Sequence, residues 1–347
     1  MYKIIIRPLL FLFNPEDIHY FIMHLLKFSF RLPLIKFFAR KLYTVNNKKL
    51  EIDFLGLKFH NPVGLAAGFD KNAEIYSEMS NLGFSFVEIG TITPQPQPGN
   101  EKPRLFRLIN DYAMINRMGF NNVGVDLAVL KLKKRNPKII IGGNIGKNTL
   151  TPNDQAINDY EYCFKQLYNY VDYFVVNVSC PNIADLLELQ DEDSLTAILN
   201  RLVEIRKEQS IKRPVLLKIS PDLSFEQVDN MIKIVYKTGI DGFVISNTTI
   251  AREGLSISEA EIEQLGSGGL SGNPLKNKST QIISYVSQNT GGKIPIIGVG
   301  GIMSPDDAIE KLKAGASLIQ IYTGFIYEGP SFVKKINKKI LQMKNTK

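Results

Sequence analysis

From residue 45 onward, short runs of apolar residues alternate with longer segments in which apolar side chains recur every three to four positions. The first pattern is typical of parallel strands buried on both faces, and the second of amphipathic helices. Helical spacing is clearest at 195–208, 225–236 and 305–314. The strand candidates, eight in all, are 63–67, 86–89, 139–143, 173–177, 215–219, 242–246, 294–299 and 317–322.

This alternation predicts an α/β protein whose eight strands close into a (β/α)8 TIM barrel rather than an open sheet. No Gly-x-Gly-x-x-Gly sequence follows the first strand, which disfavours a dinucleotide-binding fold. The length of 347 residues fits one barrel of roughly 250–300 residues with an appendage. We therefore expect a catalytic barrel over residues 44–347 and a separate helical extension over residues 1–43.

The first 43 residues are dense in Phe, Leu and Ile but are interrupted by basic residues. Residues 14–17, Asn-Pro-Glu-Asp, place a capping amide, a proline and two acids where the start of a helix prefers them. A helix that continues to about Phe30 is therefore predicted. Pro33 then begins a second, shorter helix that ends near Tyr43.

Seven basic and two acidic residues give this extension a net charge of +5, out of +8 for the whole chain. No run reaches the ~20 uninterrupted apolar residues that a membrane span requires. No small-residue cleavage site follows the apolar run 9–13, as it would in a signal peptide. Two amphipathic helices with basic faces could lie on an anionic bilayer, or they could simply pack on the barrel. The residues alone leave both interpretations open.

The remaining composition is ordinary for a soluble α/β protein, with 44% apolar and 22% charged residues. The two cysteines, Cys163 and Cys180, do not form a disulfide framework, which favours a reducing compartment. Cys163 lies in a helical pattern and is expected in the core. Three histidines do not suggest a metal site, and no nucleic-acid recognition motif accompanies the basic residues. Neither a metal nor a nucleic acid is predicted as a partner.

Nearly every predicted strand ends in a polar or glycine-rich sequence, and the carboxyl ends of barrel strands are where catalytic groups gather. Backbone N–H groups after the seventh and eighth strands are the usual phosphate site of such barrels. Each motif alone is weak, but packing does not explain so many at one end of the barrel. Together they predict a phosphorylated planar cofactor beside a small polar substrate. The motifs are 66–71, 90–94, 116–122, Asn144, Lys218, 246–249, 298–301 and 322–324.

The most informative stretch is 175–182, Val-Val-Asn-Val-Ser-Cys-Pro-Asn, at the end of the fourth predicted strand. It places Asn177, the thiol of Cys180 and a second amide, Asn182, where a barrel carries its chemistry. A buried thiol that only fills space would explain Cys180 taken alone. The neighbouring motifs favour a reactive role for it.

Five motifs of the chain occur in a familiar order and spacing: Ala-Ala-Gly-Phe-Asp-Lys, Asn-Arg-Met-Gly-Phe-Asn-Asn, Asn-Val-Ser-Cys-Pro-Asn, Asn-Thr-Thr and Gly-Val-Gly-Gly-Ile. Because of these five motifs, the segment from about residue 45 to residue 330 resembles the dihydroorotate dehydrogenases. The N-terminal helices and the single-chain layout resemble class 2, the membrane-associated, quinone-reducing form. The resemblance implies that FMN takes electrons from (S)-dihydroorotate, giving orotate for pyrimidine synthesis, and passes them to a membrane quinone.

The resemblance also implies peripheral attachment, through the N-terminal helices, to a bacterial or mitochondrial inner membrane, and we expect a monomer. It gives Cys180 the place of the general base, which removes the C5 proton of dihydroorotate while a hydride leaves C6 for the flavin. The residues implied in FMN binding are Ala67, Gly68, Phe69, Asp70, Lys71, Thr91, Asn144, Asn177, Lys218, Ser246, Gly272, Gly301, Tyr322 and Thr323. Those implied in dihydroorotate binding are Lys71, Asn116, Arg117, Met118, Gly119, Phe120, Asn177, Asn182, Asn247 and Thr248.

The chain departs from the class 2 pattern in two places. Class 2 enzymes carry serine as the base, whereas cysteine marks the soluble class 1 forms, so Cys180 is a class 1 feature within a class 2 layout. The family's lid loop normally runs Thr-(Pro/Ala)-Gly-Leu-Arg, but residues 183–187 are Ile-Ala-Asp-Leu-Leu. The thiol favours a class 1-like alternative that passes electrons to fumarate or NAD. The altered loop keeps a non-catalytic membrane scaffold as a further alternative.

Overall fold

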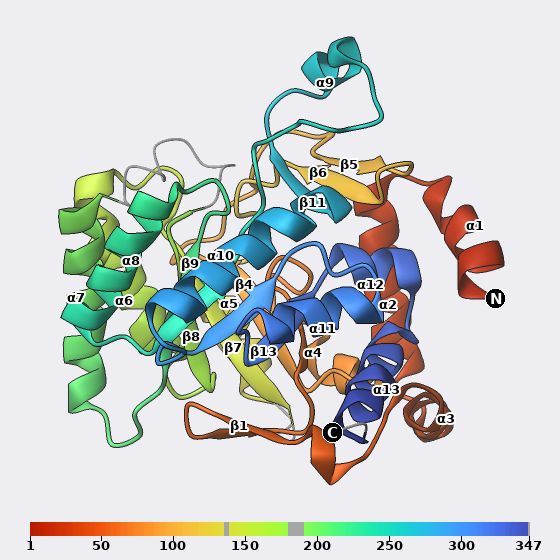
Figure 1. The fold of residues 1–347 in the computed structure, drawn as a ribbon, viewed down its shortest axis with the longest axis horizontal. Coiled ribbons are helices and arrows are strands. Elements are labelled where there is room, and N and C mark those ends of the chain that lie inside the picture. Colours follow the sequence, from red (N-terminus) through yellow and green to blue (C-terminus); the bar gives the residue numbers. More distant parts are fainter. Residues whose placement is uncertain (135–138, 180–190, 346–347) are drawn as a thin grey trace.

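The computed structural model describes residues 1–134, 139–179 and 191–345, and it contains the predicted barrel (Figure 1). Eight parallel strands close into one sheet, in which neighbours follow chain order. Each strand begins within two residues of its predicted start. The barrel strands are β3 (Val63–Leu65), β4 (Phe86–Ile92), β7 (Ile140–Ile145), β8 (Tyr173–Asn177), β9 (Val215–Ile219), β10 (Gly242–Ile245), β12 (Ile296–Val299) and β13 (Leu318–Ile321).

Large aromatic side chains fill the interior of the barrel. Phe86 of β4 and Tyr173 of β8 are both buried there. They fit because glycines stand opposite them: a Cβ on Gly64 or Gly142 would lie 2.3 Å from the nearest ring atom. Close packing of this kind leaves no room for added methyl groups, so these glycines are required by the core rather than by a turn.

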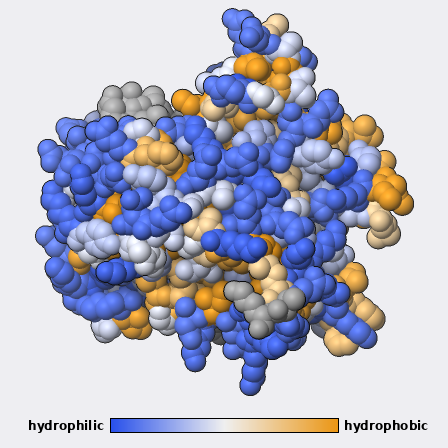
Figure 2. Space-filling view, viewed as in Figure 1, coloured by the Kyte–Doolittle hydropathy of each residue, from blue (hydrophilic) through white to orange (hydrophobic). Residues whose placement is uncertain are grey.

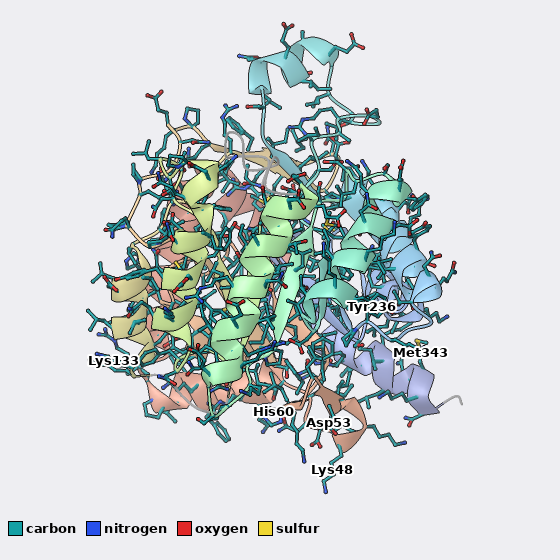
Figure 3. The ribbon with its side chains drawn as sticks, turned by 90° about the vertical axis from the view of Figure 1, so that its left-hand side faces the viewer. Lys48, Asp53, His60, Lys133, Tyr236 and Met343 are labelled. Atoms are coloured by element: carbon teal, nitrogen blue, oxygen red, sulfur yellow. The ribbon has the colours of Figure 1, made fainter. Side chains whose placement is uncertain are left out.

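Helices cover the outside of the barrel (Figures 1 and 3). Two of the three clearest predicted helices begin with a capping box, in which Ser224 or Ser304 is the N-cap residue. The third begins earlier than expected, at Glu192, because Asp191 caps it. The barrel helices are α4 (Tyr76–Met79), α5 (Val125–Leu132), α6 (Ala156–Leu167), α7 (Glu192–Glu208), α8 (Phe225–Thr238), α10 (Lys276–Asn289), α11 (Pro305–Lys313), α12 (Thr323–Glu328) and α13 (Phe332–Asn345).

The hydrophobic pattern missed two small sheets, because their strands are only three or four residues long. A hairpin of β1 (Ile52–Phe54) and β2 (Leu57–Phe59) lies at the end of the molecule opposite the protruding helix α9 (Glu259–Leu265), as the labels on Asp53 and His60 in Figure 3 indicate. Its Phe59 packs on Phe86, with ring centroids 5.2 Å apart. At the other end, β5 (Leu105–Leu108), β6 (Ala113–Asn116) and β11 (Gly269–Gly272) form an antiparallel sheet beneath α9 (Figure 1).

The two predicted N-terminal helices are present as α2 (Pro15–Ser29) and α3 (Pro33–Tyr43), with the side chain of Asn14 accepting from the first-turn N–H groups of α2. The expectation of a helix pair was incomplete. Residues before α2 are also helical, as a π-helical turn over Tyr2–Ile6 and a short α1 (Arg7–Phe11). This segment is tied to the barrel by the Tyr2 hydroxyl, which donates to the Ile326 carbonyl at 2.6 Å.

Apolar residues gather on the surface over the N-terminal helices, at the right-hand edge of Figure 2. Among them are Leu9, Phe13, Phe28 and Phe38, each more than half exposed. Within the described residues, no helix is both long enough and apolar enough to cross a bilayer.

Candidate active site

A cavity of about 320 Å³ lies at the carboxyl end of the barrel, between the strand ends and helix α2. Since eight strand ends converge there, residues far apart in the chain become neighbours. Most of the predicted site residues line this cavity. They are Ala67, Gly68, Phe69, Lys71, Thr91, Asn116, Met118, Gly119, Phe120, Asn177, Lys218, Ser246, Asn247, Thr248, Gly272, Gly301, Tyr322 and Thr323.

Three predicted site residues do not line the cavity. Asp70 is fully buried and accepts from the backbone N–H groups of Glu74 and Ile75, at 2.7 and 2.9 Å, so it shapes the loop after β3. Burial raises the pKa of Asp70 to about 6. Arg117 instead donates to the Leu265 carbonyl at the end of α9. Asn144 lies behind the cavity wall, within the hydrogen-bond network described next.

A chain of hydrogen bonds forms the floor of the cavity. The Asn177 amide donates to the Thr91 hydroxyl at 2.9 Å, and that hydroxyl donates to the Asn144 side-chain carbonyl at 2.6 Å. The Asn247 amide donates to the Asn177 side-chain carbonyl at 3.0 Å and to Ser179 at 3.3 Å. Because each member is held by another, these amides are presented to a ligand in fixed orientations.

The floor continues to a carboxylate that the sequence analysis missed. Glu88 of β4 accepts from the amides of Asn144, at 2.7 Å, and Gln320, at 2.6 Å. The Lys218 ammonium lies 3.7 Å from the same carboxylate. Glu88 occupies one position of a run that we interpreted as an apolar strand. An acid inside a strand buried on both faces is the signal that could have revealed it.

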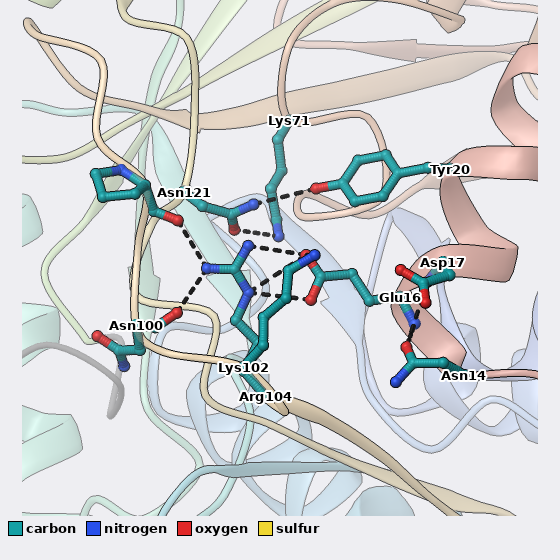
Figure 4. Close-up of polar contacts among 10 residues, drawn as sticks. Asn14, Glu16, Asp17, Tyr20, Lys71, Asn100, Lys102, Arg104 and Asn121 are labelled. Atoms are coloured by element: carbon teal, nitrogen blue, oxygen red, sulfur yellow. Dashed lines mark hydrogen bonds and ion pairs between the residues drawn. The ribbon is translucent and has the colours of Figure 1, made fainter.

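Lys71 connects the cavity to helix α2. Its ammonium donates to the Asn121 side-chain carbonyl at 2.6 Å, and the Asn121 amide donates to the Tyr20 hydroxyl at 3.2 Å (Figure 4). Lys71, predicted to contact both cofactor and substrate, is therefore positioned partly by the N-terminal extension. The sequence pattern did not predict this link, because Tyr20 lies 51 positions before Lys71 in the chain.

A buried ion pair fastens α2 to the loop before β5. The Arg104 guanidinium donates to the Glu16 carboxylate at 2.8 Å, and it also donates to the Pro98 and Asn100 carbonyls (Figure 4). Burial alone would raise the pKa of Glu16, but Arg104, with Lys102 and Lys71, outweighs burial and lowers it. The carboxylate therefore stays ionised under ordinary conditions, as its partner requires.

His19 brings α2 against the loop after β3. Its Nε2 lies 3.0 Å from the Phe69 carbonyl, and its ring meets the Phe69 ring edge-on at 4.8 Å. Burial, with a smaller effect from Lys71, lowers the pKa of His19 to about 4. At neutral pH the ring is uncharged, so Nε2 carries the proton and donates to the carbonyl. His19, like Glu16 and Tyr20, lines the cavity but was not predicted as a site residue.

The far end of the cavity is built from backbone. Gly272, Gly300 and Gly301 line it together with the Thr323 hydroxyl, which is 2.9 Å from Ser271 Oγ. A Cβ on Gly301 would lie 2.2 Å from the Lys276 Cα, so only glycine lets the two chain segments approach. Among the described lining residues the acids are Glu16 and Glu74, both outside this end. Asp307 lies next to this end, where it accepts from the Met303 N–H at 3.0 Å, but it pairs with the Lys276 ammonium at 2.7 Å, so its negative charge is balanced.

Two predicted residues, Cys180 and Asn182, lie outside the described residues, as does the predicted lid 183–187. Their neighbour Ser179 is buried, and its hydroxyl donates to the Lys218 carbonyl at 2.9 Å. The other cysteine, Cys163, is buried in α6, as predicted, and burial raises the pKa of its thiol well above the usual value. A thiol in such surroundings is inert.

The chain is similar to known proteins over almost its whole length. Residues 49–343 match the family model of dihydroorotate dehydrogenase. The chain is 54% identical to the dihydroorotate dehydrogenase (quinone) of Christiangramia forsetii, over 99% of both proteins. It is 46% identical to that of Cellvibrio japonicus, covering 94% of this chain and 95% of the relative. A ligand-free DHODH crystal structure from Eimeria tenella superposes with a TM-score of 0.86, at 36% identity, covering 96% of each chain.

Proposed function

Since the chain belongs to the dihydroorotate dehydrogenase family, in its quinone-dependent class, we propose that its barrel cavity binds FMN and dihydroorotate side by side. The enzyme oxidises dihydroorotate to orotate in pyrimidine synthesis and uses a quinone as the acceptor. The observation that carries the proposed site is the convergence of eighteen predicted residues on one cavity. Neither the class 1-like alternative nor a non-catalytic scaffold is favoured by any feature of the described residues.

The cavity residues fit FMN, the cofactor on which this family depends. The glycine-lined end, with Gly272, Gly301 and Thr323, suits the phosphate because it offers backbone N–H groups and a hydroxyl, and no acid is among its described lining residues. The part of the lining at Ala67 and Gly68 suits the ring system, since small side chains let a planar ligand approach the backbone. Of the remaining candidates, Phe69, Asp70, Thr91, Asn144, Asn177, Lys218, Ser246 and Tyr322 would surround or support the ring.

The substrate would lie over the amide-rich part of the cavity. Asn116, Asn177 and Asn247 offer both donors and acceptors, which match the ring amides and carbonyls of dihydroorotate. Lys71 supplies a positive charge for its carboxylate. Asn182 and Thr248 complete the proposed set, and the backbone around Gly119 and Phe120 closes one side.

Bound FMN supplies the hydride acceptor for the reaction. The chain's own part is to orient the dihydroorotate ring and to take its C5 proton, while the C6 hydride leaves with its electron pair. Cys180 is the proposed base. Its thiolate gains the C5 proton, and the electrons of that C–H bond form the new C5–C6 double bond of orotate.

Helices α1 to α3 form the proposed membrane contact and the entrance for quinone. Many of their apolar side chains are exposed, residues 1–43 carry a net charge of +5, and α2 lines the same cavity as the candidate flavin residues. A peripheral monomer on the inner membrane is the simplest arrangement consistent with these features.

The direct test is to release the cofactor of the purified protein by heat and identify it by chromatography. Stoichiometric FMN is expected. The same preparation should oxidise dihydroorotate with a soluble quinone, and much more slowly with fumarate or NAD. Recovery of FAD, or of no flavin from a folded sample, would overturn the proposed site.

A further inference from the structure

Glu88 is a carboxylate in the middle of a hydrophobic barrel. It is fully buried in β4, and its contacts come from three other barrel strands: Asn144 on β7, Lys218 on β9 and Gln320 on β13. A side chain that reaches residues on both sides of the barrel must point into the interior. Phe86 and Tyr173 fill the layer beneath it.

The surroundings of Glu88 are those of an ionised carboxylate. Both amides donate to it, and the third neighbour is an ammonium group. Burying an ionised carboxylate costs several kcal/mol even when partners are present, so an apolar side chain would fill this position with less electrostatic penalty. Packing therefore does not account for an acid at this position.

Each neighbour of Glu88 connects it to the cavity. Lys218 and Gln320 line the cavity themselves. Asn144 accepts from Thr91, which lines the cavity as well. Glu88 does not line the cavity, but the negative charge nearest the Lys218 ammonium in the described structure belongs to it. It therefore determines both the position and the net charge of the cavity floor.

We propose that Glu88 is a positioning residue that, through Lys218 and Asn144, sets how strongly the bound flavin holds its electrons. This rests on the proposed FMN site. Reduction adds negative charge to the flavin ring, so a nearby ammonium favours the reduced form, and a carboxylate paired with that ammonium weakens the effect. Glu88 and Lys218 are both buried, and interactions between buried charges are screened little.

The test is the flavin midpoint potential of the holoenzyme, measured by anaerobic titration against a reference dye. Glu88→Gln keeps the size of the side chain but removes its charge. Gln320 Oε1 has no hydrogen-bond partner among the described residues, so it is available to accept from the new amide. We expect reduced flavin to become about tenfold more stable relative to oxidised flavin, a rise of about 30 mV for a two-electron couple.

The matched control is Asp172→Asn, which removes a half-buried carboxylate that pairs with Arg213 at the amino end of β8, away from the cavity. This variant should keep the wild-type potential. If Glu88→Gln does not retain its flavin, Glu88→Asp is the second variant. It shortens the side chain by one methylene and so moves the carboxylate away from Lys218, and we expect a smaller rise in the midpoint potential. A flavin-loaded Glu88 variant with an unchanged potential refutes this inference alone. A wild-type protein without FMN refutes the proposed function instead.

Discussion

The barrel and the N-terminal extension use apolar side chains in opposite ways. In the barrel, strands and helices bury their apolar residues in one core, and Phe86, Tyr173 and Phe174 are almost completely hidden. In residues 1–43 only Met23, Phe30 and Ala39 are buried hydrophobics, although the segment is rich in Phe, Leu and Ile. The same residue types therefore stabilise the fold in one region and remain available to a surface in the other.

Three polar contacts join the two regions at the cavity. Glu16 pairs with Arg104, His19 meets the Phe69 carbonyl, and Tyr20 reaches Lys71 through Asn121. These polar contacts fix the orientation of α2 and leave apolar side chains on its other face exposed. The comparison suggests a division of labour, in which the barrel carries out the chemistry and the extension gives access to it.

Removing residues 1–43 tests that division most severely. The truncated protein should still bind FMN and be reduced by dihydroorotate, because the barrel floor and its glycine-lined end remain. Quinone reduction and vesicle binding should fall to background, since the exposed apolar face and the α2 wall of the cavity are gone. Flotation with anionic vesicles and a quinone assay measure the two losses.

The control for truncation is a full-length variant, Phe37→Ser/Phe38→Ser, which makes two exposed side chains of α3 polar but keeps α2 in place. It should lose vesicle binding and retain the reduction of a soluble quinone. If the truncated protein reduces quinone as fast as the full chain, the extension is only a packing element and the division of labour is wrong.

Cys180 tests the barrel side of the comparison. Cys180→Ala should keep FMN but slow flavin reduction by dihydroorotate by about 10²- to 10⁴-fold, the usual contribution of a general base. Stopped-flow absorbance measures the rate. Cys180→Ser should retain part of the activity, with its plateau at higher pH, because a thiol ionises near ~8.5 and a hydroxyl far above that. Wild-type reduction rates in Cys180→Ala would rule out this base.

The barrel could be predicted from the sequence because its signal is local and repeated. Each buried strand is a continuous apolar run, such as 173–177 and 215–219, and the capping residues Ser224 and Ser304 mark helix starts. The hairpin over β1 and β2 escaped prediction because three-residue strands carry no measurable period. The helical turns before Asn14 escaped prediction because the segments 2–6 and 7–11 are only five residues each, too short to show a helical period.

Most of the residues that line the cavity could be named from the sequence for a different reason: the family resemblance lists them, and motifs at strand ends converge whenever a barrel closes. Asn177 and Asn247 lie far apart in the chain but become neighbours, since β8 and β10 both pair with β9 and end at the same edge of the barrel. Barrel closure does not predict which residues from outside the barrel line the cavity, so His19 and Tyr20 of α2 were not predicted. Glu88 was missed because one acid in an apolar run does not alter the strand pattern.

Breaking the Glu16–Arg104 pair should weaken the attachment of α2 without touching the barrel core. Glu16→Gln leaves Arg104 buried without its counter-charge, so a loss of about 3–5 kcal/mol is expected. The pKa of Glu16 is lowered in the folded protein. The ion pair therefore stabilises the fold fully above pH 4.5, the usual pKa of a glutamate, and this stabilisation is lost as the pH falls through the lowered pKa of Glu16 in the folded protein. Thermal unfolding followed by circular dichroism between pH 3 and pH 7 measures both effects.

Glu16→Gln should be less stable than wild type at pH 7 and should lose less stability on acidification. The control is Asp17→Asn, which changes the next residue, an exposed acid, and should behave as wild type across the range. Equal pH dependence in Glu16→Gln and wild type would show that the ion pair does not hold α2.

The smallest expected effect concerns Tyr20, which connects the extension, through Asn121, to Lys71, a proposed substrate ligand. Tyr20→Phe removes the hydroxyl that accepts from Asn121, so Asn121 and the Lys71 ammonium bonded to it are held less firmly. One hydrogen bond contributes about 0.5–1.5 kcal/mol, which corresponds to a rise of about two- to tenfold in KM for dihydroorotate, with little change in kcat. Tyr162→Phe is the control, because it removes a comparable hydroxyl, bonded to Asp126, from the outer face of α6. If both variants leave KM unchanged, α2 shapes the cavity without positioning Lys71, and the two regions are more independent than their hydrogen bonds suggest.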